Sequence, residues 1–233
     1  MKRALVTGGT GGIGFGVASV LAAAGWSVIA TGVSEAEVAA CPGAPGIEPR
    51  RLDVTDDGAV AALVAGLDRL DGLVNCAGTL LRGQEYDLAV FEKVIAVNLT
   101  GTMRMCLACH PLLAASGGAI VNTASMLSFF GGPLVPAYSA SKGGVAQLTK
   151  ALAGKWAADG IRVNAVAPGW IETGMTAGLR EDRAREAAIL GRTPQGRWGQ
   201  PAEVGELVAW LLGDKATFVT GTVMPVDGGY AAM

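Results

Sequence analysis

Three polar side chains between residues 125 and 142 have the types and spacing for proton transfer. Tyr138 and Lys142 are four residues apart, so on a helix they share one face, and Ser125 adds a hydroxyl from outside that helix. A phenol ordinarily titrates near pH ~10, which makes it a poor proton donor or acceptor at neutral pH. A cation one turn away favours the phenolate, so we expect Lys142 to lower the pKa of Tyr138. A Tyr and a Lys at this spacing also occur by chance on many helices. Whether the pair is catalytic therefore depends on the other segments of the chain.

A glycine-rich segment near the N-terminus has the pattern of a pyrophosphate-binding loop. Residues 7–14 read TGGTGGIG and stand between an expected strand and an expected helix. Glycines allow a tight turn and a close approach of the backbone to a pyrophosphate, whose charge then faces the helix N-terminus. This context predicts dinucleotide binding. The expected contacts are Gly8, Thr10, Gly11, Gly12, Ile13 and Gly14.

The end of the second expected strand bears on the choice of dinucleotide. NAD-selective sites often have a carboxylate there, whereas NADP requires an Arg or Lys for its 2′-phosphate. We expect Gly32 and Val33 beside the adenosine ribose, and the sequence has neither kind of residue at that point. Because an unpaired phosphate dianion is the costlier mismatch, NAD is expected in preference to NADP.

Strands and helices alternate along the chain. Three prolines between Ser34 and Arg50 leave room there for at most one short helical turn. The pattern predicts a single α/β domain over 1–233, with a Rossmann-type, doubly wound parallel sheet of about seven strands and helices on both faces. The expected strands are 3–7, 26–31, 51–54, 71–76, 119–123, 162–167 and 222–226. The expected helices are 13–24, 56–67, 88–113 with an interruption near 98–101, 138–158 and 201–212.

Residues 170–200 are the least regular part of the chain. They contain several glycines and a dense set of charges over 180–186. Because they follow the sixth strand, we expect them over the carboxyl edge of the sheet, where ligands bind in such folds, as a lid on the substrate. The charged stretch by itself is more typical of a solvated surface helix with mixed charges.

Composition argues against several classes of protein. Hydrophobic residues make up 51% and charged residues 16%, and the net charge of −2 gives no basic field for nucleic acid or anionic lipid. No apolar run approaches the ~18 residues of a membrane span, and the glycine-broken start lacks the apolar core of a signal peptide, so a cytoplasmic location is expected. His110 is the only histidine, which argues against a Ser/His/Asp triad and against a metal site built on several histidines.

One motif points to another chemistry. Cys106, Cys109 and His110 spell C-x-x-C-H, the pattern of covalent haem attachment. That interpretation requires export, which the N-terminus does not support. We therefore expect small cysteines in the core of a mostly apolar helix, and a histidine at the helix end before Pro111.

These segments together resemble the short-chain dehydrogenase/reductase family over essentially the whole chain. Ser125 and Tyr138 are thirteen residues apart (138 − 125), as is usual in that family. Each motif is modest, but their order and spacing make coincidence implausible. The matching motifs are the TGGTGGIG loop, Asp53 in LDVTD, NCAG from Asn75 to Gly78, Asn98 in VNLTG, Ser125, Tyr138-x-x-x-Lys142, PGWIET from Pro168 to Thr173, and the late VDGG.

The resemblance implies a catalytic set of Asn98, Ser125, Tyr138 and Lys142. Tyr138 would be the general acid in ketone reduction or the base in alcohol oxidation. Lys142 would lower its pKa and hydrogen-bond the nicotinamide ribose. Ser125 would hold the substrate oxygen, and Asn98 would order a water on the proton route behind Lys142.

The resemblance also implies further cofactor contacts and an assembly. Asp53 and Val54 would meet the adenine, and the wall of the cofactor site would be Asn75, Cys76, Ala77 and Gly78. The carboxamide would be received by Ile171 and Thr173, which follow Pro168 and Gly169. Cys76 stands where a second Asn is common, and we expect it to change packing only. A homotetramer is expected, built on helices that include 102–113 and 143–156 and on the C-terminal strand.

The expected substrate is a secondary alcohol or ketone. The lid is similar to that of gluconate and deoxygluconate dehydrogenases, and Arg180, Arg192 and Arg197 are placed to meet a carboxylate. We expect a small polyol, sugar acid or similar hydroxy compound. The alternative is a 3-oxoacyl-[acyl-carrier-protein] reductase, which requires a basic docking face for its acidic partner. A non-catalytic dinucleotide-binding regulatory protein is an alternative of another class.

Overall fold

The computed structural model describes all residues from 1 to 233. It contains one seven-stranded sheet in the order β3-β2-β1-β4-β5-β6-β7, in which every pairing is parallel. The predicted doubly wound α/β fold is confirmed. The strands are β1 (Arg3–Thr7), β2 (Ser27–Gly32), β3 (Ile47–Arg51), β4 (Gly72–Asn75), β5 (Ala119–Thr123), β6 (Arg162–Pro168) and β7 (Val223–Val226).

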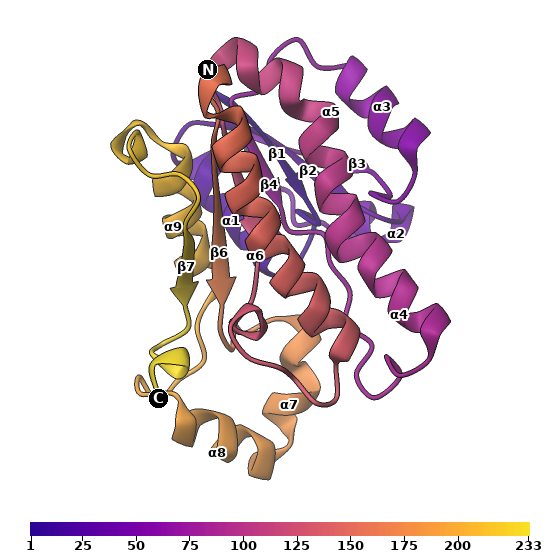
Figure 1. Cartoon of the computed structure of the whole chain (residues 1–233), viewed down its shortest axis with the longest axis vertical. Coiled ribbons are helices and arrows are strands. Elements are labelled where there is room, and N and C mark those ends of the chain that lie inside the picture. Colours follow the sequence, from indigo (N-terminus) through magenta and orange to yellow (C-terminus); the bar gives the residue numbers. More distant parts are fainter.

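Helices cover both faces of the sheet (Figure 1). Their starts follow ordinary signals: the Asp56 carboxylate caps α3 by accepting from the Ala59 N–H, and Pro201 opens α9. The helices are α1 (Gly12–Ala23), α2 (Glu35–Ala39), α3 (Asp57–Ala65), α4 (Leu88–Ile95), α5 (Gly101–Ser116), α6 (Pro136–Trp156), α7 (Ala177–Glu181), α8 (Arg183–Arg192) and α9 (Pro201–Leu212).

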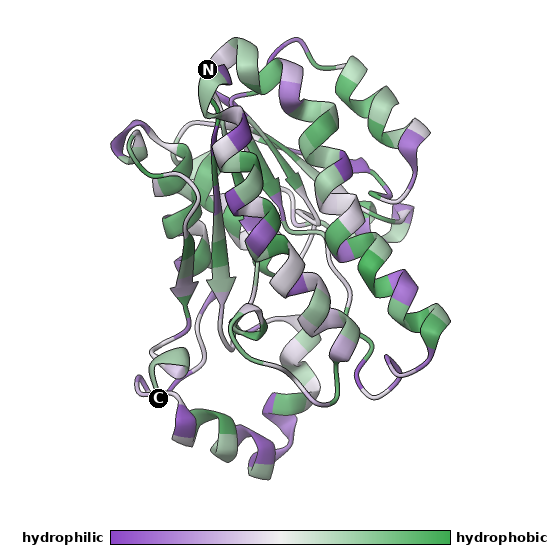
Figure 2. Ribbon diagram, viewed as in Figure 1, coloured by the Kyte–Doolittle hydropathy of each residue, from purple (hydrophilic) through white to green (hydrophobic).

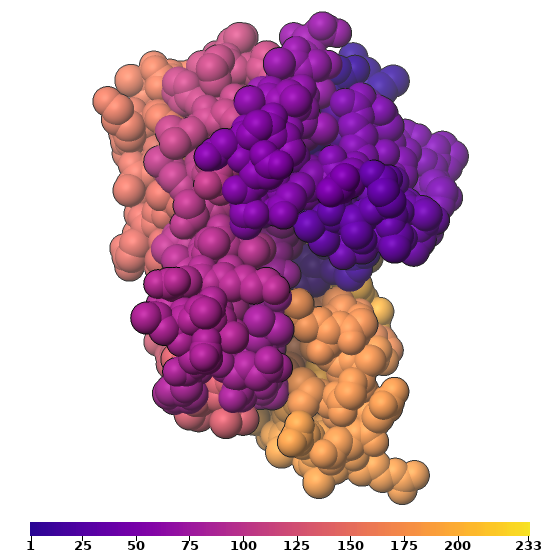
Figure 3. All heavy atoms as spheres, turned by 90° about the vertical axis from the view of Figure 1, so that its right-hand side faces the viewer, coloured from indigo at the N-terminus to yellow at the C-terminus, as the bar shows by residue number.

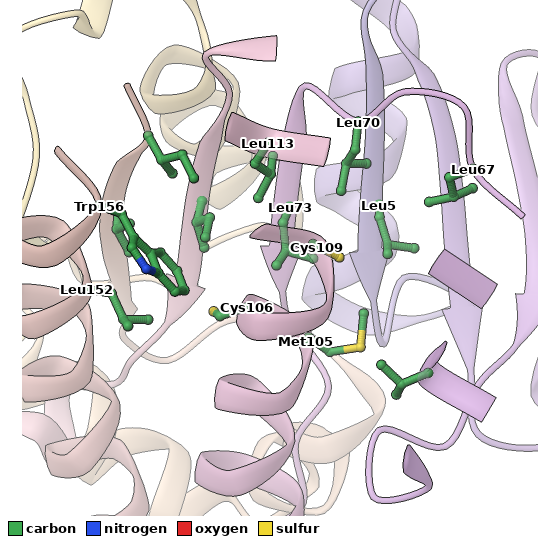
Figure 4. Close-up of a cluster of buried hydrophobic side chains, with 14 of the residues drawn as sticks. Leu5, Leu67, Leu70, Leu73, Met105, Cys106, Cys109, Leu113, Leu152 and Trp156 are labelled. Carbon is green, nitrogen blue, oxygen red and sulfur yellow. The ribbon is translucent and has the colours of Figure 1, made fainter. Parts of the chain in front are cut away.

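Side chains alternate between two apolar cores, one on each side of the sheet. From β1, Leu5 packs with α5 and α6, whereas Ala4 and Val6 pack with α1 and α9. Figure 4 shows the first core, where Leu5 and Leu73 face Met105 on α5. Because both faces are covered, the central strands consist mainly of buried apolar residues, interrupted by Asn75, Asn122 and Asn164. Figure 2 shows green segments in the strands between the helix layers.

The third strand differs from its predicted position. It begins at Ile47, four residues before the expected start, ends at Arg51, and includes Pro49. The prolines up to Pro49 predict at most one short helical turn before the strand. β3 lies at the edge of the sheet and pairs with β2 only, so it needs donors toward one side alone and tolerates a proline.

The interruption predicted near 98–101 is a π-helical turn, Ala96–Thr100, between α4 and α5. The helix predicted to end at Leu113 continues to Ser116, so His110 and Pro111 lie within α5 rather than at its end. The carbonyl left free by Pro111 belongs to Leu107, whose side chain is on the exposed face of α5, where water can reach it.

The cysteines of the C-x-x-C-H sequence are core residues, as expected. Cys106 and Cys109 have no exposed surface, and burial raises the pKa of both thiols, in the case of Cys109 to about 12. His110 points elsewhere: its Nε2 lies 2.9 Å from an Asp159 carboxylate oxygen, and its ring packs on Trp156. None of the helices is both long and apolar enough to span a membrane.

Candidate active site

Six of the seven strands end in a segment that the sequence predicted for the site. Because the strands are parallel, these ends share one edge, at the bottom of Figure 1. The strand order reverses between β1 and β4, which is where ligands bind in such sheets. The segments are 8–14 after β1, 32–33 at β2, 53–54 after β3, 75–78 at β4, 125 after β5, and 168–173 at β6.

Tyr138 and Lys142 lie one turn apart at the start of α6. Lys142 is 4% exposed, and its Nζ donates to the carbonyl of Thr123 at 2.6 Å. The same Nζ lies 5.5 Å from the centre of the Tyr138 ring. Burial disfavours the ammonium and lowers the pKa of Lys142 to about 8. The predicted pairing on one helix face is present.

The expected lowering of the Tyr138 pKa is not found. Burial of the phenol raises this pKa, the nearby Ser125 hydroxyl lowers it, and the negative charge of Glu85 raises it further, so the net direction is upward. The Lys142 ammonium donates to the Thr123 carbonyl, and no hydrogen bond joins it to the phenol oxygen. In the protein alone, Tyr138 is therefore held in its protonated form.

Ser125 is fixed where the chain leaves β5. Its backbone is extended, and its hydroxyl accepts from the Leu127 N–H at 3.2 Å. Ser128 accepts from the Ser125 N–H and donates to the carbonyl of Lys142 at 2.7 Å. The loop after β5 is thereby joined to α6, which brings Ser125 beside Tyr138.

Asn98 lies in the π-helical turn and is 1% exposed. Its amide accepts from the N–H of Thr79 at 2.8 Å and donates to the Thr79 carbonyl at 3.0 Å and the Ser141 hydroxyl at 3.1 Å. A Cβ on Gly78 would lie 3.4 Å from the Asn98 amide oxygen and 3.8 Å from the Lys142 Nζ. Asn98 and Lys142 thus lie on the same side of Gly78 without a direct hydrogen bond.

The glycine loop has the shape for a pyrophosphate. Gly8 has φ +64° and packs against Ala77, where a Cβ would come within 2.9 Å of backbone atoms. Gly11 precedes α1 with no side-chain cap on the helix N-terminus, and a Cβ there would meet nothing within 4 Å. An uncapped helix N-terminus beside open space is suited to an anion. The residues therefore fit the cofactor that the loop predicts.

Three predicted cofactor contacts have hydrogen-bond partners within the protein. The Asn75 amide is 3% exposed and donates to Asn122 at 2.9 Å inside the sheet. One Asp53 carboxylate oxygen accepts from the N–H and the hydroxyl of Thr55, which lower the pKa of Asp53. Cys76 lies beside Lys142 and accepts from the Thr123 hydroxyl, and burial raises the pKa of its thiol.

Sequence reasoning missed two charged residues at the end of β2. A Glu37 carboxylate oxygen accepts from the Val33 N–H at 2.9 Å, so a carboxylate does stand at this strand end. The signal was present in Ser34-x-x-Glu37, the pattern of a helix capping box. Arg51, at the end of β3, pairs with Gly32 in the sheet and approaches the Val33 carbonyl at 3.4 Å.

The lid arginines are not equivalent. Arg180 pairs with Glu172, and Arg197 pairs with Glu203 at 2.6 Å. Arg192 has no carboxylate within ion-pair distance. In Figure 3 the lid, in orange, forms its own lobe below the indigo N-terminal residues.

Arg192 contacts aromatic rings instead. Its guanidinium carbon lies 4.3 Å from the centre of the Tyr230 ring and 5.4 Å from that of Phe130. Tyr230 packs edge-on against Trp170, which directly follows Gly169 at the end of β6. The cation therefore stands at the carboxyl edge of the sheet, among loops that follow β5 and β6.

Comparisons with known proteins agree with this geometry. A family model described as enoyl-(acyl carrier protein) reductase matches residues 8–231. A 2-dehydro-3-deoxy-D-gluconate 5-dehydrogenase of Pseudoalteromonas atlantica is 42% identical, covering 98% of this chain and 95% of that protein. A cis-4-hydroxycyclohexanecarboxylate dehydrogenase of Sinomonas cyclohexanicum is 43% identical, covering 100% and 97%. The crystal structure of a gluconate 5-dehydrogenase from Burkholderia cenocepacia, with NADP and tartrate, has a TM-score of 0.93 at 32% identity, covering 100% and 96%.

A parallel doubly wound sheet with a glycine loop at its switch point defines a dinucleotide-binding fold. The chain belongs to the short-chain dehydrogenase/reductase family. It is an NAD(P)-dependent enzyme that acts on CH–OH groups. The alternative of a non-catalytic regulatory protein is therefore set aside.

Proposed function

We propose that this enzyme interconverts a secondary alcohol and a ketone in a small hydroxy acid, with a sugar acid as the leading class. Its catalytic residues are Ser125, Tyr138, Lys142 and Asn98. The observation that carries the proposal is the placement of a protonated Tyr138 beside Ser125 and one turn from a buried Lys142, at the switch edge of the sheet. Residues 170–200 act as the lid of this site.

The residues divide the work by position. A bound nicotinamide supplies or accepts the hydride. Ser125 holds the substrate oxygen, and Tyr138 gives that oxygen a proton during reduction or removes it during oxidation. Lys142, whose pKa is about 8, returns a proton to Tyr138 after the reduction step. Asn98 holds the Ser141 hydroxyl by a hydrogen bond on the inner side of α6.

The substrate class is tested by a turnover screen. Polyols, sugar acids and 3-oxoacyl thioesters are assayed with both cofactors by the absorbance of the reduced nicotinamide. We expect activity on sugar acids or related hydroxy acids. Activity on the thioesters alone would establish the alternative, an acyl-carrier-protein reductase.

We further propose that Arg192 binds the carboxylate of the substrate. Support comes from its uncompensated charge, its place at the carboxyl edge, and two relatives named for gluconate and carboxylate substrates. Arg192→Gln should raise the KM for a hydroxy acid by about 10- to 100-fold, because a charged hydrogen bond contributes about 1.5–3 kcal/mol.

Arg183→Gln is the matched control, since Arg183 lies on the same helix without an aromatic partner. It should leave KM unchanged. If Arg192→Gln alters KM no more than this control does, another group binds the carboxylate.

NAD is the proposed cofactor, and the carboxylate of Glu37 supports this preference. A carboxylate at the end of β2 accepts from a ribose hydroxyl and repels a 2′-phosphate. Arg51, which approaches the Val33 carbonyl, forms an ion pair with Glu35 at 3.9 Å. We expect Glu37→Gln to weaken NADH binding about tenfold and to strengthen NADPH binding, because it removes a charged acceptor.

Binding is measured by fluorescence titration of both reduced cofactors. Glu48→Gln, an exposed acid on β3 that pairs with Arg50, serves as the control. The proposal is overturned when the unmodified protein binds NADPH more tightly than NADH.

The proposed assembly is a homotetramer. Met105, Cys106 and Cys109 on α5 are buried within one chain. The helix face over 102–113 therefore leaves less apolar surface for a subunit contact than expected. Support lies mainly near α9 and β7, where Trp210 is 39% exposed and Phe218 is fully exposed. Sedimentation velocity tests it, and a monomer at micromolar concentration would contradict it.

A further inference from the structure

Glu85 is a buried carboxylate that the sequence motifs do not include. It lies in the segment between β4 and α4 and is 1% exposed. None of the ion pairs of the chain includes it. Burying an unpaired charge costs several kcal/mol unless hydrogen bonds replace the lost water. Its position therefore requires specific partners.

Both carboxylate oxygens of Glu85 accept from backbone N–H groups. One accepts from Leu81 at 3.0 Å and the other from Tyr138 at 2.8 Å. Tyr138 is the third residue of α6, where the N–H has no partner inside the helix. Val135, which precedes α6, provides no side-chain cap. Glu85 thus caps this helix from a distant segment, and the positive end of the helix stabilises its charge.

The backbone of Tyr138 is held on its other side as well. Its carbonyl accepts from the Ser141 hydroxyl at 2.7 Å, and that hydroxyl accepts from the Asn98 amide at 3.1 Å. Asn98 in turn bonds both backbone groups of Thr79, in the same segment as Glu85. A closed circuit of hydrogen bonds therefore joins the segment 79–85, the π-helical turn and the residue that carries the phenol.

The charge of Glu85 also acts on the phenol itself. It raises the pKa of Tyr138 and so adds to the effect of burial. The other titratable groups around the phenol are Lys142, on the same helix, and Cys76, which lies against Lys142. Ser125 contributes a neutral hydroxyl.

We propose that Glu85 is a positioning residue for the reaction: it fixes the backbone of Tyr138 relative to Asn98 and holds the phenol in its proton-donating state. The inference rests on the proposed function, in which Tyr138 transfers the proton. A cap needed for folding alone would be met at lower cost by an exposed Ser or Asp before the helix. A buried acid in contact with Tyr138 adds both an anchor and a charge.

The test combines turnover with an alkaline titration of the protein without ligands. Tyrosinate absorbance in the near ultraviolet is compared with that of the Tyr138→Phe counterpart, which isolates one of three tyrosines. In Glu85→Gln the negative charge is lost, so the Tyr138 titration should move to lower pH by about half a unit to one unit. The kcat should fall about 10- to 100-fold, with the affinity for cofactor unchanged.

Glu85→Asp separates the effect of the negative charge from that of side-chain length. The shorter carboxylate keeps the charge but cannot meet both N–H groups, so kcat should fall while the titration stays near that of the unmodified protein. Asp87→Asn is the matched control: Asp87 is an exposed acid in the same segment that caps α4 through the Val90 N–H. It should change neither quantity, since Asn is an equally good cap.

Each outcome bears on the proposal. An unshifted titration in Glu85→Gln, or full turnover in Glu85→Asp, overturns it. Thermal stability and cofactor affinity that fall together, with the phenol unaffected, would make Glu85 a folding element only and also overturn it. Because the titration needs no substrate, it stands even when the proposed substrate class fails.

Discussion

Tyr138→Phe is expected to lower kcat by about 10²- to 10⁴-fold, the usual contribution of a general acid or base. The substitution removes one oxygen and leaves the ring in place. The ring lies 5.5 Å from the Lys142 Nζ, which remains bonded to the Thr123 carbonyl in the variant. No other phenol lies at this point of α6, so nothing replaces the lost proton donor.

Cofactor binding should change little in the same variant. The glycine loop, the Ala77 wall and the Lys142 ammonium are untouched. Fluorescence titration with the reduced cofactor is expected to give the same dissociation constant within about threefold, because the fold and the anion site are preserved. Loss of turnover with retained binding identifies Tyr138 as a group that acts in the chemical step.

Tyr86→Phe is the matched control for that experiment. Tyr86 is 77% exposed and donates to the Pro133 carbonyl at 2.9 Å, outside the proposed site. It should retain nearly full activity. Undiminished turnover in Tyr138→Phe would falsify the assignment of Tyr138 as the proton donor.

The sequence predicted those elements whose ends have local signals. β5 matches its predicted bounds, and so does α9, which begins at Pro201 and ends before Gly213. The predicted position of β3 was wrong because β3 can contain Pro49 only as an edge strand of the sheet. A strand's place in a sheet is set by distant residues, so no local pattern reports it.

The same distinction holds within the site. The spacing of Tyr138 and Lys142 predicts a shared helix face, since helix geometry fixes it. The direction of the Tyr138 pKa could not be predicted, because burial and Glu85 both come from other segments. Glu85 itself lies in the segment between β4 and α4 and matches no motif, and its contact with Tyr138 exists only in the folded chain.

Gly14→Ala is expected to remove both cofactor binding and much of the stability of the N-terminal half of the sheet. A Cβ at Gly14 would lie 2.1 Å from the Gly8 carbonyl oxygen and 2.8 Å from its carbon. Both are backbone atoms of the loop, so no side chain can rotate away. Gly8 cannot retreat either, because it already packs against the backbone of Ala77.

The energetic cost follows from that geometry. Overpacking of this kind costs about 1–3 kcal/mol or more, since the loop must move as a unit. Displacing the loop also moves the N-terminus of α1 away from the position that receives the pyrophosphate. We expect the dissociation constant for the cofactor to rise at least about 100-fold, which corresponds to about 2.7 kcal/mol.

Gly154→Ala separates this effect from a general cost of replacing glycine. Gly154 lies in α6, where a Cβ meets nothing within 4 Å. Alanine there should stabilise the protein by about 0.5–1 kcal/mol, because it restricts the unfolded chain and favours the helix. The two variants therefore shift the denaturation midpoint in opposite directions. A Gly14→Ala protein with an unaltered denaturation midpoint and cofactor affinity would contradict this prediction. It would show that the loop can accommodate a methyl group at position 14.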